Sequence, residues 1–215
     1  MKIFLDTADT EVISKHFATG LIDGITTNPS LIRKSGRDPE DVYQELIDLG
    51  VKDISMEVVG NGIEMAREGE RLFKKFGERA TIKVPCTPDG LYACRVLSKN
   101  LIKVNVTLIF SAAQAILAAK AGATYVSPFV GRLDDNSIAG LEVVRSISEI
   151  FRIHGIHTQV LSASIRTVQR AVRSWYNGAE VVTMPPKVFE DMYNHVLTDK
   201  GLEIFDNDWK AVQSR

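Results

Sequence analysis

The chain has 215 residues, of which 45% are hydrophobic and 25% charged, as in an ordinary soluble globular protein. Its 26 basic and 27 acidic side chains leave a net charge of -1, which excludes a strongly basic surface for nucleic acid or anionic lipid. No run approaches the roughly 20 apolar residues of a membrane span, and residues 1–10 lack the apolar segment of a signal peptide. We therefore expect a cytoplasmic protein that binds neither nucleic acid nor membrane.

Short apolar runs alternate with longer amphipathic segments along the chain. The runs predicted as strands are KIFLD (2–6), DGITT (23–27), ISMEVV (54–59), TIKVP (81–85), KVNVTL (103–108), YVSPFV (125–130), TQVLSAS (158–164) and EVVTMP (180–185). Helical spacing of apolar residues predicts helices over 40–50, 62–77 and 111–122, the last opening with a serine cap.

Eight strands that each precede a helical segment predict an α/β protein, a single (β/α)8 TIM barrel over residues 1–215. The strands are continuously apolar, as in a parallel sheet covered on both faces. An open doubly wound sheet is the alternative, but no GxGxxG follows the first strand.

A ninth unit, residues 201–215, is predicted as an additional C-terminal helix. Leu202, Phe205 and Trp209 recur on one face at helical spacing. This apolar stripe needs a partner, which is either the chain's own barrel or a neighbouring subunit.

Polar residues follow nearly every predicted strand, and the carboxyl ends of barrel strands are where active sites lie. They are Asp6, Thr26, Thr27, Asn28, Glu57, Lys83, Asn105, Thr107, Ser127, Arg132, Ser162, Ser164 and Arg166. Only the eighth strand, which ends in Met184 and Pro185, offers nothing titratable.

Lys83 is the sharpest of these signals. Alternation along its strand points Ile82 and Val84 towards the helices and Lys83 into the barrel, where no solvent face receives a lysine. An unprotonated buried amine is the nucleophile that forms a Schiff base with a carbonyl, although a structural ion pair would also account for the position. Lys103, by contrast, opens its strand and is expected to be solvated.

Two carboxylates could serve the same site. Glu57, in mid-strand, is a candidate ion-pair partner of Lys83 or a proton shuttle. Asp6 is either a second proton-transfer group or the N-cap of a helix that begins near Ala8. An amine with two carboxylates suits imine chemistry, which needs repeated proton transfers.

Arg132 and Arg166 follow the sixth and seventh strands, the region where barrels of this type commonly bind phosphate. A surface salt bridge is the alternative for each arginine. Asp134 and Asp135 are the expected partners of Arg132 in that case.

Seven segments together resemble one known family. They are KIFLDTA, GITTNPSLI, SMEVVG, IKVPCTPDGL, VNVTLIFSAAQA, YVSPFVGRLDD and SASIRT, and the similarity runs from residue 2 to about residue 210. The chain is similar to the transaldolase family, more closely to its short single-domain branch, which also contains fructose-6-phosphate aldolase.

The resemblance implies four catalytic roles. Lys83 would form the Schiff base, and Asp6 would handle the proton of the substrate C4 hydroxyl. Glu57 would shuttle protons through a water molecule held by Thr107. The imine acts as the electron sink, so no cofactor and no metal are expected.

The substrate-binding residues that the resemblance implies are Thr26, Asn28, Asn105, Ser127, Phe129, Arg132, Ser164 and Arg166. Asn28 and Asn105 would hold substrate hydroxyls or the imine region, and Ser127 the dihydroxyacetone end. The two arginines with Ser164 would hold the phosphate of a sugar substrate.

The resemblance also implies a reaction and an assembly. The expected transferase moves a dihydroxyacetone unit between sedoheptulose 7-phosphate and glyceraldehyde 3-phosphate, in the pentose phosphate pathway. Glu57 and Phe129 favour the transaldolases, because the aldolases have Gln and Tyr there. A fructose-6-phosphate aldolase and a non-catalytic sugar-phosphate-binding barrel are the alternatives. The branch is similar in forming homo-oligomers, decamers of two pentamers with C-terminal helices that reach across subunits.

Overall fold

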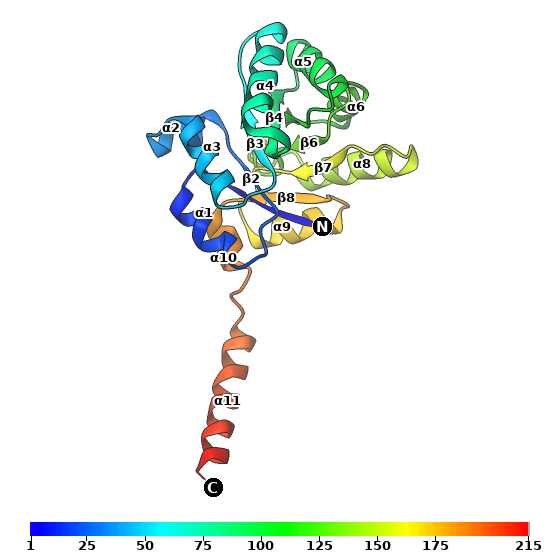
Figure 1. Cartoon of the computed structure of the whole chain (residues 1–215). Helices are drawn as coiled ribbons and strands as arrows, with labels where there is room; N and C mark the ends of the chain where they lie inside the picture. Colours follow the sequence, from blue (N-terminus) through cyan, green and yellow to red (C-terminus); the bar gives the residue numbers. More distant parts are fainter. Residues whose placement is uncertain (215) are drawn as a thin grey trace.

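The computed structural model describes residues 1–214, and over these residues eight parallel strands form one closed barrel. Each strand pairs with its neighbours in the chain, and β8 closes the sheet against β1 (Figure 1). The strands are β1 (Lys2–Asp6), β2 (Gly24–Thr26), β3 (Ile54–Glu57), β4 (Ala80–Pro85), β5 (Val104–Ile109), β6 (Tyr125–Pro128), β7 (Gln159–Ser162) and β8 (Val181–Met184). The predicted (β/α)8 barrel is thereby confirmed.

Helices follow every strand and cover the outside of the barrel. They are α1 (Thr10–Phe17), α2 (Pro29–Ser35), α3 (Pro39–Asp48), α4 (Gly62–Phe76), α5 (Pro88–Lys99), α6 (Ala112–Lys120), α7 (Val130–Asp135), α8 (Gly140–Ile153), α9 (Val168–Tyr176), α10 (Pro186–Asp191) and α11 (Val196–Gln213). The 3-10 turn Gly77–Arg79 joins α4 to β4. Within residues 1–214, no helix is both long enough and apolar enough to cross a bilayer.

Side-chain caps fix where these helices begin. Ser111 caps α6 as the sequence predicts, since its hydroxyl accepts the backbone N–H of Gln114. Asn61 and Glu64 form a reciprocal capping box at the start of α4. Such caps satisfy N–H groups of the first helical turn that have no partner within the helix, whereas α7, α8 and α10 have no side-chain cap.

Strand register places the polar residues of neighbouring strands at one level. Asp6 pairs with Thr26, and Lys83 pairs with Glu57 on one side and Asn105 on the other. Because side chains alternate along each strand, these residues all face the barrel interior near the carboxyl ends. The prediction for β4 is confirmed, since Ile82 and Val84 lie in the apolar core outside the barrel.

Two apolar clusters support this arrangement. The larger one lies between the strands and the surrounding helices. The smaller one fills the barrel and consists of Phe4, Tyr125, Leu161, Ala163 and Val181, with Phe129 at its edge. The polar residues of the site lie next to this inner cluster, on the side of the carboxyl ends of the strands.

Polar groups close the other end of the barrel. Asp53 accepts hydrogen bonds from Thr81 at 2.7 Å, from Tyr125 at 3.0 Å and from Lys103 at 3.0 Å. The expectation that Lys103 is solvated was therefore wrong: its side chain is 30% exposed and paired, because Asp53 needs a counter-charge in a partly buried position.

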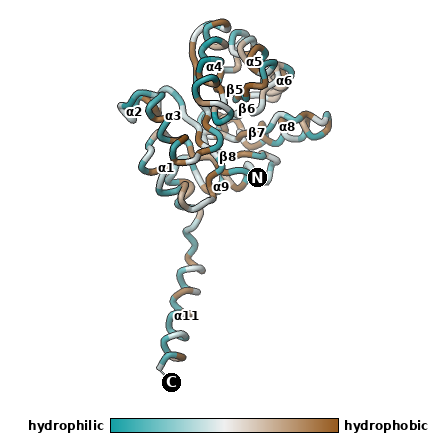
Figure 2. The backbone as a smooth tube through the Cα atoms, in the orientation of Figure 1, coloured by the Kyte–Doolittle hydropathy of each residue, from teal (hydrophilic) through white to brown (hydrophobic). Residues whose placement is uncertain are grey.

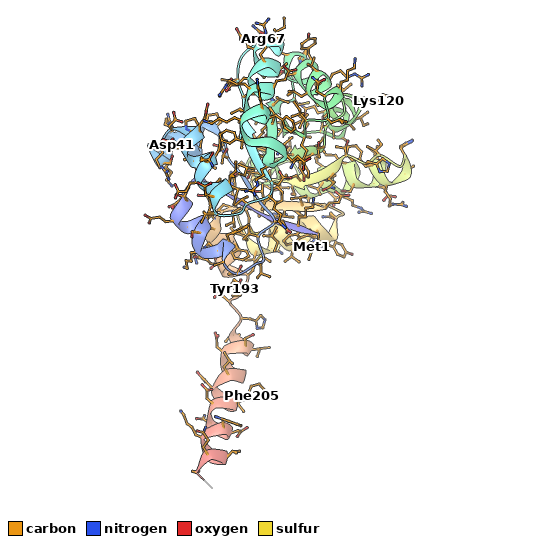
Figure 3. All side chains as sticks on the ribbon, viewed as in Figure 1. Met1, Asp41, Arg67, Lys120, Tyr193 and Phe205 are labelled. Carbon is orange, nitrogen blue, oxygen red and sulfur yellow. The ribbon has the colours of Figure 1, made fainter. Side chains whose placement is uncertain are left out.

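α11 projects away from the barrel (Figure 1). It begins at Val196, five residues before the predicted start, and Arg215 lies outside the described residues. None of its residues is buried, and hydrophobic positions recur along it (Figure 2). Leu202, Phe205 and Trp209 are 56%, 70% and 63% exposed, and the Phe205 side chain points into solvent (Figure 3). Packing of this stripe on the chain's own barrel, one of the two alternatives, is therefore excluded.

Candidate active site

A cavity of about 130 Å³ opens at the carboxyl ends of the strands. Its lining comes from β1, β2, β4, β5, β6, β7 and β8 and from the loops that follow them. Glu57 of β3 is not part of this lining but contacts Lys83, which is. The lining residues are Asp6, Thr26, Asn28, Lys83, Asn105, Thr107, Ser127, Phe129, Arg132, Leu161, Ala163, Ser164 and Thr183. The structure thus brings together ten of the twelve predicted site residues in one cavity, with Glu57 and Arg166 beside it.

Lys83 is the charged centre of the cavity and is buried. Its ammonium nitrogen lies 2.9 Å from Glu57 Oε2 and donates a hydrogen bond to the backbone carbonyl of Thr27 at 3.0 Å. The Glu57 side chain is only 17% exposed. A charge-assisted pair in such a place is short and directional, so the nitrogen has a fixed position at the cavity wall.

Asp6 is held by a threonine. Thr26 Oγ1 donates to Asp6 Oδ1 at 2.8 Å and lies 2.7 Å from Thr183 Oγ1. Burial raises the pKa of the Asp6 carboxyl, while the positive charge of Lys83 and the Thr26 hydrogen bond act in the opposite direction. The alternative role of Asp6 as a helix cap is wrong, because Asp9 caps α1, which begins at Thr10.

One amide and two hydroxyl groups form a hydrogen-bonded chain across β6, β5 and β3. Ser127 donates to Asn105 Oδ1 at 2.6 Å, and Asn105 Nδ2 donates to Ser55 Oγ at 3.2 Å. Thr107 Oγ1 is buried, and within residues 1–214 it makes no hydrogen bond. A buried hydroxyl of this kind in a polar cavity is suited to a water molecule or a substrate oxygen.

Asn28 does two things at once. Its Oδ1 accepts the backbone N–H of Leu31 at 3.0 Å and so caps α2, where Pro29 occupies the first turn. The side chain lines the cavity, so its amide NH₂ group is the part directed to a ligand.

The alternative of a surface salt bridge holds for Arg166 and not for Arg132. Asp135 binds Arg166, with Nη1 donating to Oδ1 at 2.5 Å, and Asp134 binds Arg170 at 3.0 Å. Arg132, the expected partner of both aspartates, instead lies over the ring of Phe129, 5.0 Å from its centroid. The two aspartates at the end of α7 thus reach the loop after β7 and the start of α9, and Arg132 lines the cavity.

The loop after β7 has a strained backbone at Ser164, where φ is +57°. The backbone N–H of Gly131 donates to the Ser164 carbonyl at 3.0 Å. A Cβ at position 131 would lie 2.3 Å from that carbonyl and 2.9 Å from Arg166 Nε. Glycine is therefore required where α7 touches this loop, and the contact fixes Ser164 and Arg166 next to Arg132.

Sequence reasoning misplaced one residue and missed others. Ser162, counted among the strand ends, points outward and hydrogen-bonds Ser174 of α9 at 2.9 Å. Thr183 of β8 and Ser55 of β3 were missed. The signal for Ser55 was its position two residues before Glu57, which puts both on one face of the strand.

The fold and the cavity define a class of protein, a parallel (β/α)8 barrel with a buried lysine between carboxylates at its mouth. Within residues 1–214, no three His, Cys, Asp or Glu side chains gather as metal ligands would. The profile of the transaldolase/fructose-6-phosphate aldolase family matches residues 3–215.

Relatives of known family cover almost the full chain. A protein named probable transaldolase from Paracoccus denitrificans is 54% identical over 210 residues, 97% of this chain and 96% of its own. Proteins with the same name from Anaeromyxobacter sp. (strain K) and Caulobacter vibrioides are 52% and 50% identical over 213 residues, 99% of this chain and 98% of theirs. The chain belongs to the transaldolase/fructose-6-phosphate aldolase family.

Replacing Asp6 with Asn is expected to stabilise the fold increasingly as the pH rises. The folded pKa of Asp6 lies above its ordinary value of 3.8, so the folded chain binds this proton more tightly than the unfolded chain does. Ionisation of Asp6 therefore lowers the free energy of unfolding. This loss is absent at a pH below the ordinary pKa and complete at a pH above the folded pKa. The Tm difference between Asp6→Asn and wild type should widen as the pH rises above the ordinary value of 3.8 and level off above the folded pKa. A constant difference would show that burial does not disfavour the Asp6 carboxylate.

Proposed function

We propose that the protein is a transaldolase that carries a three-carbon unit on Lys83. The observation that supports this most directly is the buried Lys83 nitrogen, 2.9 Å from Glu57 and inside a cavity lined by hydroxyl and amide groups. Such a cavity matches a polyhydroxylated substrate, and a fixed amine matches attack on its carbonyl.

In the proposed reaction, Lys83 attacks the C2 carbonyl of a ketose phosphate. Attack needs the amine without its extra proton, and Glu57 Oε2 is in contact to take it. The carbonyl oxygen leaves as water, and the protonated imine withdraws electrons from the C3–C4 bond. Glu57 and a water molecule on the Thr107 hydroxyl carry the protons of these steps.

Asp6 is the group for carbon–carbon cleavage. It takes the proton of the C4 hydroxyl as the C3–C4 bond breaks, and an aldose phosphate leaves. The three-carbon unit stays on Lys83 until an acceptor aldehyde arrives, to which Asp6 returns a proton. A raised pKa makes the Asp6 carboxylate a stronger base for the substrate proton than an ordinary aspartate is.

The phosphate and the hydroxyls of the sugar have separate partners in this scheme. Arg132 and Arg166, with Ser164 between them, bind the phosphate as charge-assisted donors. Asn28 and Asn105 bind hydroxyls or the imine region, and Ser127 binds the dihydroxyacetone end. The substrates are sedoheptulose 7-phosphate and glyceraldehyde 3-phosphate, and the products are erythrose 4-phosphate and fructose 6-phosphate.

A fructose-6-phosphate aldolase is the second candidate, since its family is shared. It would release the three-carbon unit as free dihydroxyacetone. Phe129, which packs between Phe110 and Arg132, has no hydroxyl to deliver a proton or a water molecule to that unit. This feature, together with Glu57, favours transfer over release.

Borohydride added with fructose 6-phosphate is expected to inactivate the enzyme and to add a reduced dihydroxyacetone or sugar mass to Lys83. Borohydride reduces the imine to a stable amine, so the label marks the residue that formed it. Peptide mass spectrometry locates the label, and Lys103, paired with Asp53 at the other end of the barrel, is the internal control. A label on Lys103, or none, would leave a non-catalytic sugar-phosphate-binding barrel.

Phe129→Tyr is expected to shift the enzyme from transfer towards release. The new hydroxyl would lie at the cavity wall, where it can relay a proton to the carbon of the bound unit. The measurements are the free dihydroxyacetone released from fructose 6-phosphate alone, and the ratio of free dihydroxyacetone to sedoheptulose 7-phosphate when erythrose 4-phosphate is present. An unchanged ratio in a folded variant would remove Phe129 as the controlling residue and point to Glu57.

We also propose that the protein is a cytoplasmic homo-oligomer in which α11 lies against a neighbouring subunit. Leu202, Phe205, Trp209 and Val212 form an exposed apolar stripe along α11, larger than the scattered apolar residues of a monomer surface. Cys86 and Cys94 are both free thiols, which suits a reducing compartment. A decamer of two pentamers is the assembly that the family resemblance suggests.

The double variant Phe205→Glu/Trp209→Glu is expected to lower the mass measured by light scattering, because charges would replace apolar groups buried on assembly. Asn207→Glu, on the opposite face of the helix, is the matched control and should leave the mass unchanged. An unchanged mass in the double variant would show that the stripe is not an interface.

A further inference from the structure

Two threonines connect Asp6 to the eighth strand, which lies on the other side of β1 from β2. Thr26 Oγ1 is 2.8 Å from Asp6 Oδ1 and 2.7 Å from Thr183 Oγ1, and both threonines are 2% exposed. Within residues 1–214, Thr183 Oγ1 has Thr26 as its hydrogen-bond partner and no other. The three groups therefore form a short relay that ends at Thr183.

Counting protons shows that the relay has a preferred direction. A carboxylate only accepts, so the single proton of Thr26 points to Asp6 when Asp6 is ionised. The Thr26 oxygen then accepts, and the Thr183 proton points to it, which satisfies all three groups. When Asp6 is protonated, the Thr26 hydroxyl donates to a neutral carboxyl oxygen, and the hydrogen bond loses its charge assistance. The relay therefore favours the carboxylate.

We propose that Thr183 is a positioning residue for Asp6: its hydroxyl orients that of Thr26 and so holds the carboxylate form ready to accept the substrate proton. This inference rests on the proposed function, in which Asp6 takes the proton of the C4 hydroxyl. Thr183 acts through Thr26, which separates its role from that of a group that contacts the reacting atoms.

The other groups that face Asp6 decide how much the relay matters. Burial and the negative charge of Glu57 from β3 raise the pKa of Asp6, and the positive charge of Lys83 from β4 lowers it. Lys83 is shared with Glu57, at 2.9 Å, so its charge is not available to Asp6 alone. A hydrogen bond from Thr26, strengthened by the one it accepts, adds a second effect that stabilises the carboxylate.

The test is Thr183→Val, which keeps the shape of the side chain and removes its hydroxyl. Because the carboxylate is the active form, kcat/KM for cleavage rises with pH as Asp6 loses its proton. Without the Thr183 hydroxyl, the Thr26 hydrogen bond stabilises the Asp6 carboxylate less. The rising limb of the pH profile should therefore move to higher pH by about half a unit to one unit. Thr183→Ser, which restores a hydroxyl, should return the limb to its wild-type position.

The matched control is Thr81→Val. Thr81 is also a buried barrel threonine that donates to a carboxylate, Asp53, at 2.7 Å, but it lies at the other end of the barrel. Its loss should lower the Tm as a buried hydroxyl does and leave the limb in place. A limb that does not move in Thr183→Val, or a higher KM with an unmoved limb, would overturn the proposal and make Thr183 a structural or substrate-contact residue.

A second measurement does not depend on turnover. The pH at which the Tm difference between Asp6→Asn and its parent stops widening should be higher in the Thr183→Val background than in wild type. If Thr183→Val does not fold, Thr183→Cys, whose thiol is a weak donor, should give a smaller shift in the same direction, and no shift would overturn the proposal. Borohydride labelling of Lys83 in wild type separates the two failures: a labelled Lys83 with an unmoved limb refutes only the role of Thr183.

Discussion

The constraint on which the site depends is an ammonium group inside a parallel barrel. A parallel sheet covered by helices has no solvated face, so the charge of Lys83 must be balanced within the barrel. Glu57 of β3 supplies the counter-charge, and the backbone carbonyl of Thr27, the residue after β2, is a further acceptor. The register that pairs Glu57 with Lys83 is therefore fixed by electrostatics as much as by the apolar core.

A layered interior makes this charge tolerable. Polar closure around Asp53 ends the barrel on one side, the inner apolar cluster fills its middle, and the hydroxyl and amide groups gather above. The same arrangement gives Asp6 a raised pKa, because the carboxyl is buried near a lysine that already has a partner.

The fold and most of the site could be predicted from the sequence for one physical reason, which is that side chains alternate along strands. Once β4 is read as a strand, Lys83 must face inward, and the same rule puts Glu57 and Asn105 beside it. The barrel then brings all strand ends to one place, whatever their separation in the chain. Ser164 shows the limit of the rule: its positive φ comes two residues after β7 ends at Ser162, and no pattern in the sequence indicates it.

What could not be predicted depends on contacts between loops and on surfaces that the chain does not cover. Asp134 and Asp135 lie close in sequence to Arg132, yet they bind Arg170 and Arg166, because α7 meets the loop after β7 at Gly131. Proximity in sequence favours ion pairs between Arg132 and these aspartates. Only the tertiary structure shows that Arg132 instead lies over the Phe129 ring. The apolar stripe of α11 was predicted correctly as a stripe, but its partner is not a property of one chain's sequence. The apolar face of α11 remains exposed after the barrel has formed, so packing against the barrel does not stabilise this helix. Its stabilisation comes from whatever covers that face, and it is therefore separate from the stability of the barrel.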